Sequence, residues 1–198
     1  STSLELGGKS PFIVFEDADL DSAANAQVSG IFAATGQSCV AGSRHVVQRS
    51  VKDAMLERLK AKAEAIQIAA PDLMTTEVGP LCTKRQRDRI ESLVAQSLEQ
   101  GARLITGGQA IEGAGFYYPP TILDCSATPQ AAAITEELFG PVLSVVTFDT
   151  EAQALDLAAG QADAAFADDL FVMQRQLADE GMRVGQLGDF LDAPPIRA

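Results

Sequence analysis

Short apolar runs that read as strands alternate along this chain with segments whose apolar residues recur at helical spacing. Residues 12–15 (FIVF) and 45–47 (HVV) are two such runs, and residues 142–148 (VLSVVTF) are the strongest, being apolar and β-branched almost throughout. Apolar residues three and four apart predict helices over residues 20–34 and 83–100. This alternation is typical of a layered α/β domain. We therefore predict an open, mainly parallel sheet flanked by helices.

Signals for helix starts and ends accompany these segments. Acidic residues precede the first helix, where they complement the helix dipole, and Gly36 is its expected C-cap. Residues 50–53 (SVKD) resemble a capping box with Asp in place of Glu. Gly101 closes the helix over residues 83–100, one side of which is charged. The helix that follows the capping box has its expected apolar face at Met55, Leu56, Leu59 and Ala63.

Composition narrows the class of protein. The chain has 198 residues, 46% hydrophobic and 21% charged, enough for one domain or a domain and a part. Its net charge of −12 has the wrong sign for binding nucleic acid or an anionic membrane surface. No apolar run reaches the roughly 20 residues needed to span a bilayer. We expect a soluble protein that binds neither nucleic acid nor membrane.

The cysteine and histidine content limits the chemistry. The cysteines are three, Cys39, Cys82 and Cys125, widely spaced and without a CxxC pair, so neither a disulfide framework nor a zinc site is expected. A reducing, cytoplasmic setting fits this pattern best. His45 is the single histidine, which argues against metal sites and against nucleophiles paired with histidine. Catalysis by this chain would have to use carboxylates and thiols.

Three side chains stand where they could do chemistry, and each has a plainer interpretation. Cys39 lies among small residues in 36–44 (GQSCVAGSR), where a substrate could approach a nucleophilic thiol, although many cysteines are buried and inert. Glu5 is flanked by apolar residues, which could raise its pKa toward that of a general base, or it is a surface acid. Glu137 lies in the turn before residues 142–148, where it could bind a sugar hydroxyl or be solvated.

Other features are interpreted as structural. His45 is taken as a strand residue, and Cys82 and Cys125 as structural cysteines. Residues 8–10 (GKS) suggest a phosphate-binding loop, but the glycine required five residues earlier is replaced by Ser3 and a proline follows.

Three motifs, in this order, resemble those of the NAD(P)-dependent aldehyde dehydrogenase family. They are residues 4–11 (LELGGKSP), residues 36–39 (GQSC) with Arg44, and residues 137–142 (ELFGPV). The spacing between Glu5 and Cys39 is similar as well. Further matches are residues 11–21 (PFIVFEDADLD), 79–81 (GPL) and 115–121 (GFYYPPT). The resemblance runs from about residue 2 to about residue 158.

The resemblance implies a mechanism for oxidising a small-molecule aldehyde. Cys39 would attack the carbonyl as a thiolate, with its own backbone N–H helping to hold the oxyanion of the thiohemiacetal. Hydride would then pass to NAD or NADP, and Glu5 would activate the water that hydrolyses the thioester.

The resemblance also implies a cofactor site and an assembly. Glu137 would bind the nicotinamide ribose, Phe139 would pack near the nicotinamide ring, and the backbone of Leu6 and Gly7 would line the same pocket. Members of the family form homo-oligomers.

Members of the family are more than twice as long as this chain. We therefore expect residues 1–158 to be a partial catalytic domain that lacks most of the cofactor-binding site. Residues 159–198 match none of the family pattern and are expected to form a divergent, irregular, acidic, alanine-rich tail, from a changed reading frame or a foreign sequence. Two classes of function remain: part of an aldehyde dehydrogenase, or a catalytically incomplete remnant or interaction module with at most thiol-esterase activity.

Overall fold

The computed structural model describes residues 7–159, 171–173 and 184–185. Strands and helices alternate through most of this part, as the sequence predicts. The strands are β1 (Pro11–Val14), β2 (Arg44–Gln48), β3 (Arg103–Thr106), β4 (Thr121–Asp124), β5 (Val142–Phe148), β6 (Phe171–Met173) and β7 (Val184–Gly185). The helices are α1 (Leu20–Phe32), α2 (Lys52–Ala65), α3 (Lys84–Glu99), α4 (Ala132–Thr135) and α5 (Glu151–Ala159), with short 3₁₀ turns η1 (Ala33–Gly36) and η2 (Arg49–Val51).

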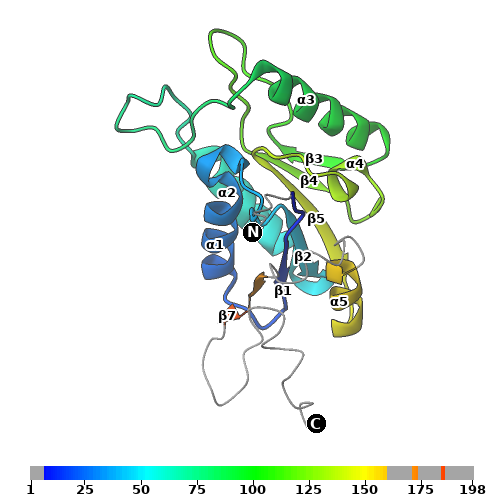
Figure 1. Ribbon diagram of the computed structural model, residues 1–198. Helices are drawn as coiled ribbons and strands as arrows, with labels where there is room; N and C mark the ends of the chain where they lie inside the picture. Colours follow the sequence, from blue (N-terminus) through cyan, green and yellow to red (C-terminus); the bar gives the residue numbers. More distant parts are fainter. Residues whose placement is uncertain (1–6, 160–170, 174–183, 186–198) are drawn as a thin grey trace, which may run out of the picture.

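The described strands form one sheet in the order β3-β4-β5-β2-β1-β6-β7 (Figure 1). Neighbours from β4 to β6 pair in parallel, whereas β3 and β7 pair antiparallel at the two edges. β2 lies between β1 and β5, so it is paired on both sides, and its residues are almost all buried. The predicted mainly parallel α/β sheet is confirmed.

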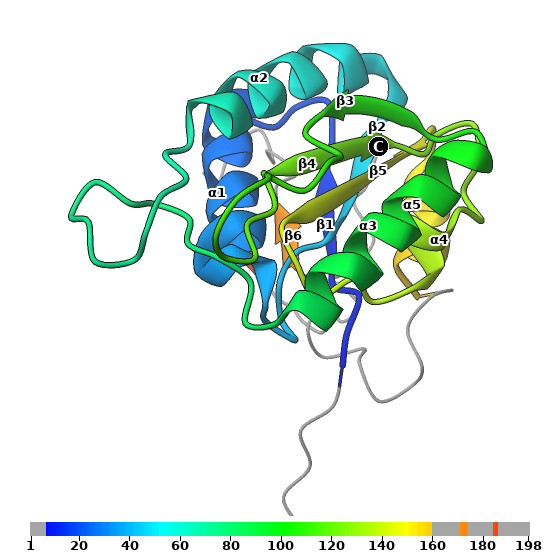
Figure 2. The same ribbon diagram turned by 90° about the horizontal axis from the view of Figure 1, so that it is seen from above.

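Helices cover both faces of the sheet, giving three layers (Figure 2). Because side chains alternate along a strand, neighbouring strand residues enter different layers. In β2, Val46 packs with residues of α3, α4 and α5, while Val47 packs with residues of α1 and α2. Two apolar clusters therefore lie on the two faces of the sheet.

Side-chain caps define two of the helix starts. Asp19 caps α1 by accepting a hydrogen bond from the Ser22 N–H at 2.8 Å, and Thr83 caps α3 by accepting one from the Gln86 N–H at 3.1 Å. The expected apolar face of α2, formed by Met55, Leu56, Leu59 and Ala63, is buried.

Two of the predicted helix ends are wrong. The capping box at residues 50–53 does not form: Val51 is the N-cap of α2 without a side-chain bond, and the Ser50 hydroxyl donates instead to Glu16 at 2.7 Å. Gly36 is not the C-cap of α1, which ends at Phe32, because the backbone turns left-handed over the following residues. A tertiary contact therefore replaces the local motif at Ser50, and a local backbone turn ends α1 before Gly36.

The expected tail falls mostly outside the described residues. Within it, the backbone of β6 pairs in parallel with β1, and β7 pairs with β6. None of the helices in the described ranges is long and apolar enough to cross a bilayer.

Asp124 is expected to contribute stability that is lost in acid. Burial alone would raise the pKa of its carboxyl group, but hydrogen bonds from Ser126, Arg103 and Lys52 outweigh burial and lower it from 3.8 to about 2. A lowered pKa stabilises the folded state above pH 3.8, and this stabilisation disappears as the pH falls toward 2. Allowing for the exposure of Arg103, we expect Asp124→Asn to cost about 1–2 kcal/mol at pH 7.

Urea unfolding at pH 7 and pH 3 measures this effect. The difference between the two proteins should shrink at pH 3. Asp149→Asn is the matched control, because Asp149 pairs with Arg49 on the surface and its loss should change stability little. A difference for Asp124→Asn that stayed constant from pH 7 to pH 3 would contradict the assignment.

Candidate active site

The candidate residues that the structure describes lie in loops at the amino ends of three neighbouring strands. Gly7 precedes β1, Cys39 precedes β2, and Glu137 and Phe139 precede β5. Because β1, β2 and β5 are adjacent and parallel, these loops meet at one edge of the sheet. Glu5 and Leu6 fall outside the described residues, so their predicted roles stay predictions.

The loop that carries Cys39 leaves α1 through an unusual backbone turn. Ala34, Thr35 and Gly36 are all in the left-handed region, with φ of 49°, 58° and 66°. This conformation is rare for residues other than glycine and is kept only when the surroundings hold it. The thiol of Cys39 is free and the residue is half-buried, so it is not sealed inside the core.

Direct contacts hold this loop against its neighbours. A Cβ atom on Gly36 would lie 2.2 Å from the carbonyl oxygen of Gly140, so the cysteine loop packs against the turn that follows Glu137. The Gln37 side chain accepts a hydrogen bond from the Cys82 N–H at 3.0 Å. The loops before β2, α3 and β5 therefore form one connected surface.

Glu137 is held over the glycine turn that precedes β1. The Gly8 N–H donates to the Glu137 carboxylate at 3.0 Å, across 129 residues of sequence. A Cβ atom on Gly7 would lie 2.1 Å from the same carboxylate, so a larger residue there would push the Glu137 side chain out of its present position. The structure thus brings together Gly7 and Glu137, which belong to two separate sequence motifs.

Helix α3 clamps the turn that carries Glu137 and Phe139. The Arg89 guanidinium donates to the Glu137 carbonyl at 2.6 Å, and the Gln86 amide donates to the Leu138 and Phe139 carbonyls at 2.6 and 3.0 Å. Phe139 has a left-handed φ of 51°, and its aromatic side chain is 39% exposed. The clamp fixes an exposed aromatic ring beside a carboxylate.

Sequence reasoning missed Gln86 and Arg89. They lie on the polar side of α3, which the sequence pattern identified only as charged. Their spacing of three residues in the first turns of the helix places them on one face and is the signal that could have suggested a shared target.

Lys9 lies next to this site and is unusual for a lysine. Its ammonium group is buried and has no hydrogen-bond partner within the described residues. Burial and the nearby Arg44 lower its pKa to about 7, while Cys125, Glu137 and Glu136 oppose the shift. The amine therefore titrates near neutral pH.

The other two cysteines differ from each other. Cys125 is buried, and burial raises the pKa of its thiol to about 12, so it is an inert core residue as predicted. Cys82 is exposed and is not part of the core. No group of three metal-ligating side chains occurs among the residues with described positions.

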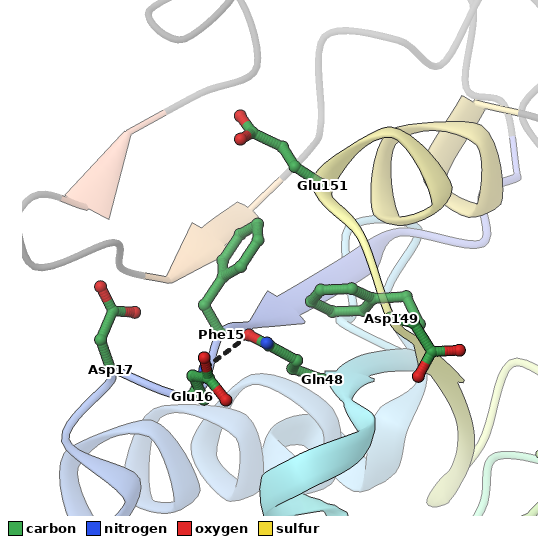
Figure 3. A pocket seen from close by; sticks show the side chains of 7 residues that line it. Phe15, Glu16, Asp17, Gln48, Asp149 and Glu151 are labelled. Carbon is green, nitrogen blue, oxygen red and sulfur yellow. Dashed lines mark hydrogen bonds between the residues drawn. The ribbon is translucent and has the colours of Figure 1, made fainter. Parts of the chain in front are cut away.

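A cavity of about 270 Å³ lies at the opposite edge of the sheet, at the carboxyl ends of β1, β2 and β5 (Figure 3). It is rich in carboxylates, and the Glu16 N–H donates to Gln48 across its floor at 2.9 Å. The lining residues are Phe15, Glu16, Asp17, Gln48, Phe148, Asp149 and Glu151. In open parallel sheets ligands ordinarily bind beyond the carboxyl ends of the strands, whereas Glu137 lies at the amino end of β5.

Comparison with known proteins gives one consistent family. The model of the aldehyde dehydrogenase family matches residues 1–187. The chain is 62% identical over 156 residues to (Z)-2-((N-methylformamido)methylene)-5-hydroxybutyrolactone dehydrogenase of Acinetobacter baylyi, covering 79% of this chain and 32% of that protein. It is 42% identical over 155 residues to the succinate semialdehyde dehydrogenase Sad of Escherichia coli, covering 78% of this chain and 33% of that protein.

Solved structures agree with the sequence relatives. An NAD-dependent aldehyde dehydrogenase from Sinorhizobium meliloti superposes with a TM-score of 0.75 at 41% identity, over 78% of this chain and 31% of that chain. An NAD⁺ complex of the Bacillus cereus aldehyde dehydrogenase does so with a TM-score of 0.75 at 36% identity, over 78% of this chain and 31% of that chain. The chain spans about a third of the length of these relatives. It belongs to the aldehyde dehydrogenase family.

Proposed function

We propose that this chain is the catalytic-domain part of an enzyme that oxidises a small aldehyde to a carboxylic acid with NAD or NADP. Cys39 is the nucleophile: its thiolate adds to the aldehyde carbonyl, and the Cys39 backbone N–H helps to hold the resulting oxyanion. The half-buried Cys39, on a loop braced by its neighbours, is the observation that carries the proposal. Glu5 is the base that activates water against the thioester.

The edge that carries Cys39 also fits a nicotinamide cofactor. The Glu137 carboxylate can accept hydrogen bonds from ribose hydroxyls, and the exposed ring of Phe139 offers an apolar face to a planar heterocycle. The backbone of Gly7 lines the same pocket, and we propose the same role for Leu6. When bound, the cofactor supplies the hydride acceptor. The residues of this chain orient the nicotinamide end of the cofactor. The remainder of the cofactor site lies in segments of the longer family members that this chain does not span.

Hydrolysis of a nitrophenyl ester tests the thiol chemistry in the chain itself. We expect Cys39-dependent release of nitrophenol, reduced to the uncatalysed background in Cys39→Ala. Cys82→Ala is the matched control, because Cys82 is exposed and outside the proposed chemistry, and it should keep the wild-type rate. An unchanged rate in Cys39→Ala would show that the nucleophile is wrongly assigned.

Reduction of NAD or NADP with a simple aldehyde, if it occurs, distinguishes a dehydrogenase domain from a remnant. Ester hydrolysis together with cofactor reduction supports a dehydrogenase domain. Ester hydrolysis without cofactor reduction is the result expected of a remnant that keeps only its reactive thiol, and equally of a domain whose remaining cofactor-binding residues lie outside this chain.

A further inference from the structure

Two polar side chains are buried beneath the loop that carries Cys39. Gln27 lies on α1 and His45 on β2, and neither is exposed to solvent. The Gln27 side-chain nitrogen donates to the carbonyl oxygen of Gly42 at 2.7 Å. The Gln27 side-chain oxygen lies 2.7 Å from His45 Nδ1. Buried polar groups are costly unless hydrogen-bonded, so a pair of this kind in an apolar layer needs a physical reason.

The carbonyl of Gly42 determines where the protons lie. A carbonyl oxygen only accepts, so the amide nitrogen of Gln27 must face Gly42 and the amide oxygen must face His45. His45 Nδ1 therefore carries the ring proton, and Nε2 has a lone pair with no partner among the described residues. Burial lowers the pKa of His45 to about 3, so the ring stays neutral near pH 7, as this arrangement requires.

Packing around the pair leaves it little freedom. The His45 ring stacks on Phe12 with the ring centres 5.7 Å apart and an angle of 19° between the planes. A Cβ atom on Gly42 would meet Gln27 at 3.4 Å and Phe12 at 3.7 Å. The direction of the Gly42 carbonyl is therefore set by contacts on α1, β1 and β2 together.

The loop that carries Cys39 is held at its Gly42 end and exposed to solvent nearer the cysteine. Ala41 is buried with the α1 and α2 cluster, whereas Val40 is 46% exposed and Cys39 is half-buried. Only Val40 and Ala41 lie between Cys39 and the anchored Gly42. Holding the Gly42 carbonyl thus limits the positions that the Cys39 side chain can take.

We propose that Gln27 and His45 are positioning residues for Cys39: His45 orients the Gln27 amide, and the amide holds the Gly42 carbonyl so that the thiol is presented at the loop surface. This inference rests on the proposed function, in which Cys39 is the nucleophile. Neither side chain touches the reacting atoms.

The rate of Cys39 alkylation by iodoacetamide tests the proposal. Peptide mass spectrometry reads it at pH 7 in the full chain, after circular dichroism has shown that each variant is folded. Gln27→Leu keeps the volume but removes both bonds, and it should slow alkylation of Cys39 about five-fold, the factor expected from one net hydrogen bond. His45→Leu should slow it similarly. His45→Asn, which keeps an N–H near the position of Nδ1, should stay within about two-fold of wild type.

Leu59→Ala is the matched control for general loss of stability. Leu59 is buried on α2 in the same layer, and its truncation leaves the bonds of Gln27 intact. It should leave the Cys39 rate unchanged. Nitrogen NMR of the single histidine should show the proton on Nδ1.

The outcomes separate this proposal from the proposed function. An unchanged alkylation rate in folded Gln27→Leu, an equal slowing in Leu59→Ala, equal slowing in His45→Asn and His45→Leu, or a proton on Nε2 would each overturn the positioning role. Ester hydrolysis that did not depend on Cys39 would instead contradict the proposed function. Alkylation and NMR do not require ester turnover, so they test the positioning role separately.

Discussion

Gly36→Ala is expected to destabilise the fold by about 3 kcal/mol and to displace the loop that carries Cys39. The added Cβ would lie 2.2 Å from the Gly140 carbonyl oxygen and 2.8 Å from the Pro141 nitrogen. Both are backbone atoms, so they cannot rotate away as a side chain would. Alanine would also have to adopt a φ of +66°, a conformation that costs an L-residue about 1 kcal/mol or more.

Urea unfolding followed by circular dichroism measures the effect, with Gly30→Ala as the matched control. Gly30 lies inside α1, and a Cβ there would meet no atom within 4 Å. Since alanine favours helix over glycine by about 0.5–1 kcal/mol, Gly30→Ala should be neutral or stabilising. Equal stabilities for the two variants would refute the tight contact between the cysteine loop and the turn after Glu137.

Arg44→Met is expected to cost about 3–5 kcal/mol, because it leaves three carbonyl groups without their donor. Arg44 is almost fully buried. Its guanidinium donates to the backbone carbonyl oxygens of Lys9 at 2.7 Å, Leu157 at 2.7 Å and Ala158 at 3.0 Å. The last two carbonyls lie at the C-terminal end of α5, where a positive charge is also stabilised by the negative end of the helix dipole. Burial lowers the pKa of Arg44 to about 10, so it remains charged at neutral pH.

Arg49→Met is the control that separates a buried arginine from an exposed one. Arg49 makes two hydrogen bonds to Asp149, at 2.7 and 2.9 Å, but both side chains are more than half exposed. Water replaces those bonds, so the stability of Arg49→Met should stay close to wild type. Thermal unfolding of both variants measures the difference, and a similar loss of stability for each would show that the bonds of Arg44 to Lys9 and to the end of α5 are not what stabilises the fold.

Periodicity predicted the elements well where one face of a segment is buried. Strand β5 spans Val142–Phe148 as predicted, and α3 spans Lys84–Glu99 within the predicted residues 83–100. In each element the spacing of the apolar residues follows from which of its faces are buried. The capping box at residues 50–53 failed because Ser50 found a partner in Glu16, 34 residues away. A motif of four consecutive residues contains no information about a hydrogen-bond partner so far away in the sequence.

In the candidate site, too, local sequence patterns predicted single residues but not the contacts between distant segments. Sequence motifs selected Cys39, Gly7 and Glu137, but the Gly8–Glu137 hydrogen bond joins residues 129 positions apart. Gln86 and Arg89 gave only the weak signal of their three-residue spacing, because polar residues on one side of a helix are ordinarily solvated. Only the packing of α3 against the turn before β5 gives them a target.

The sequence by itself determined the α/β class, most of the helices and strands, and the residue types that could do chemistry, because hydrophobic spacing and small-residue turns are local properties of the chain. Tertiary structure alone decided the strand order, which places β2 between β1 and β5, and so decided that three distant loops meet at one edge. It also decided that His45 is a buried hydrogen-bond partner of Gln27 as well as a residue of a strand. These features depend on contacts between residues far apart in the sequence, and such contacts are set by the packing of whole layers.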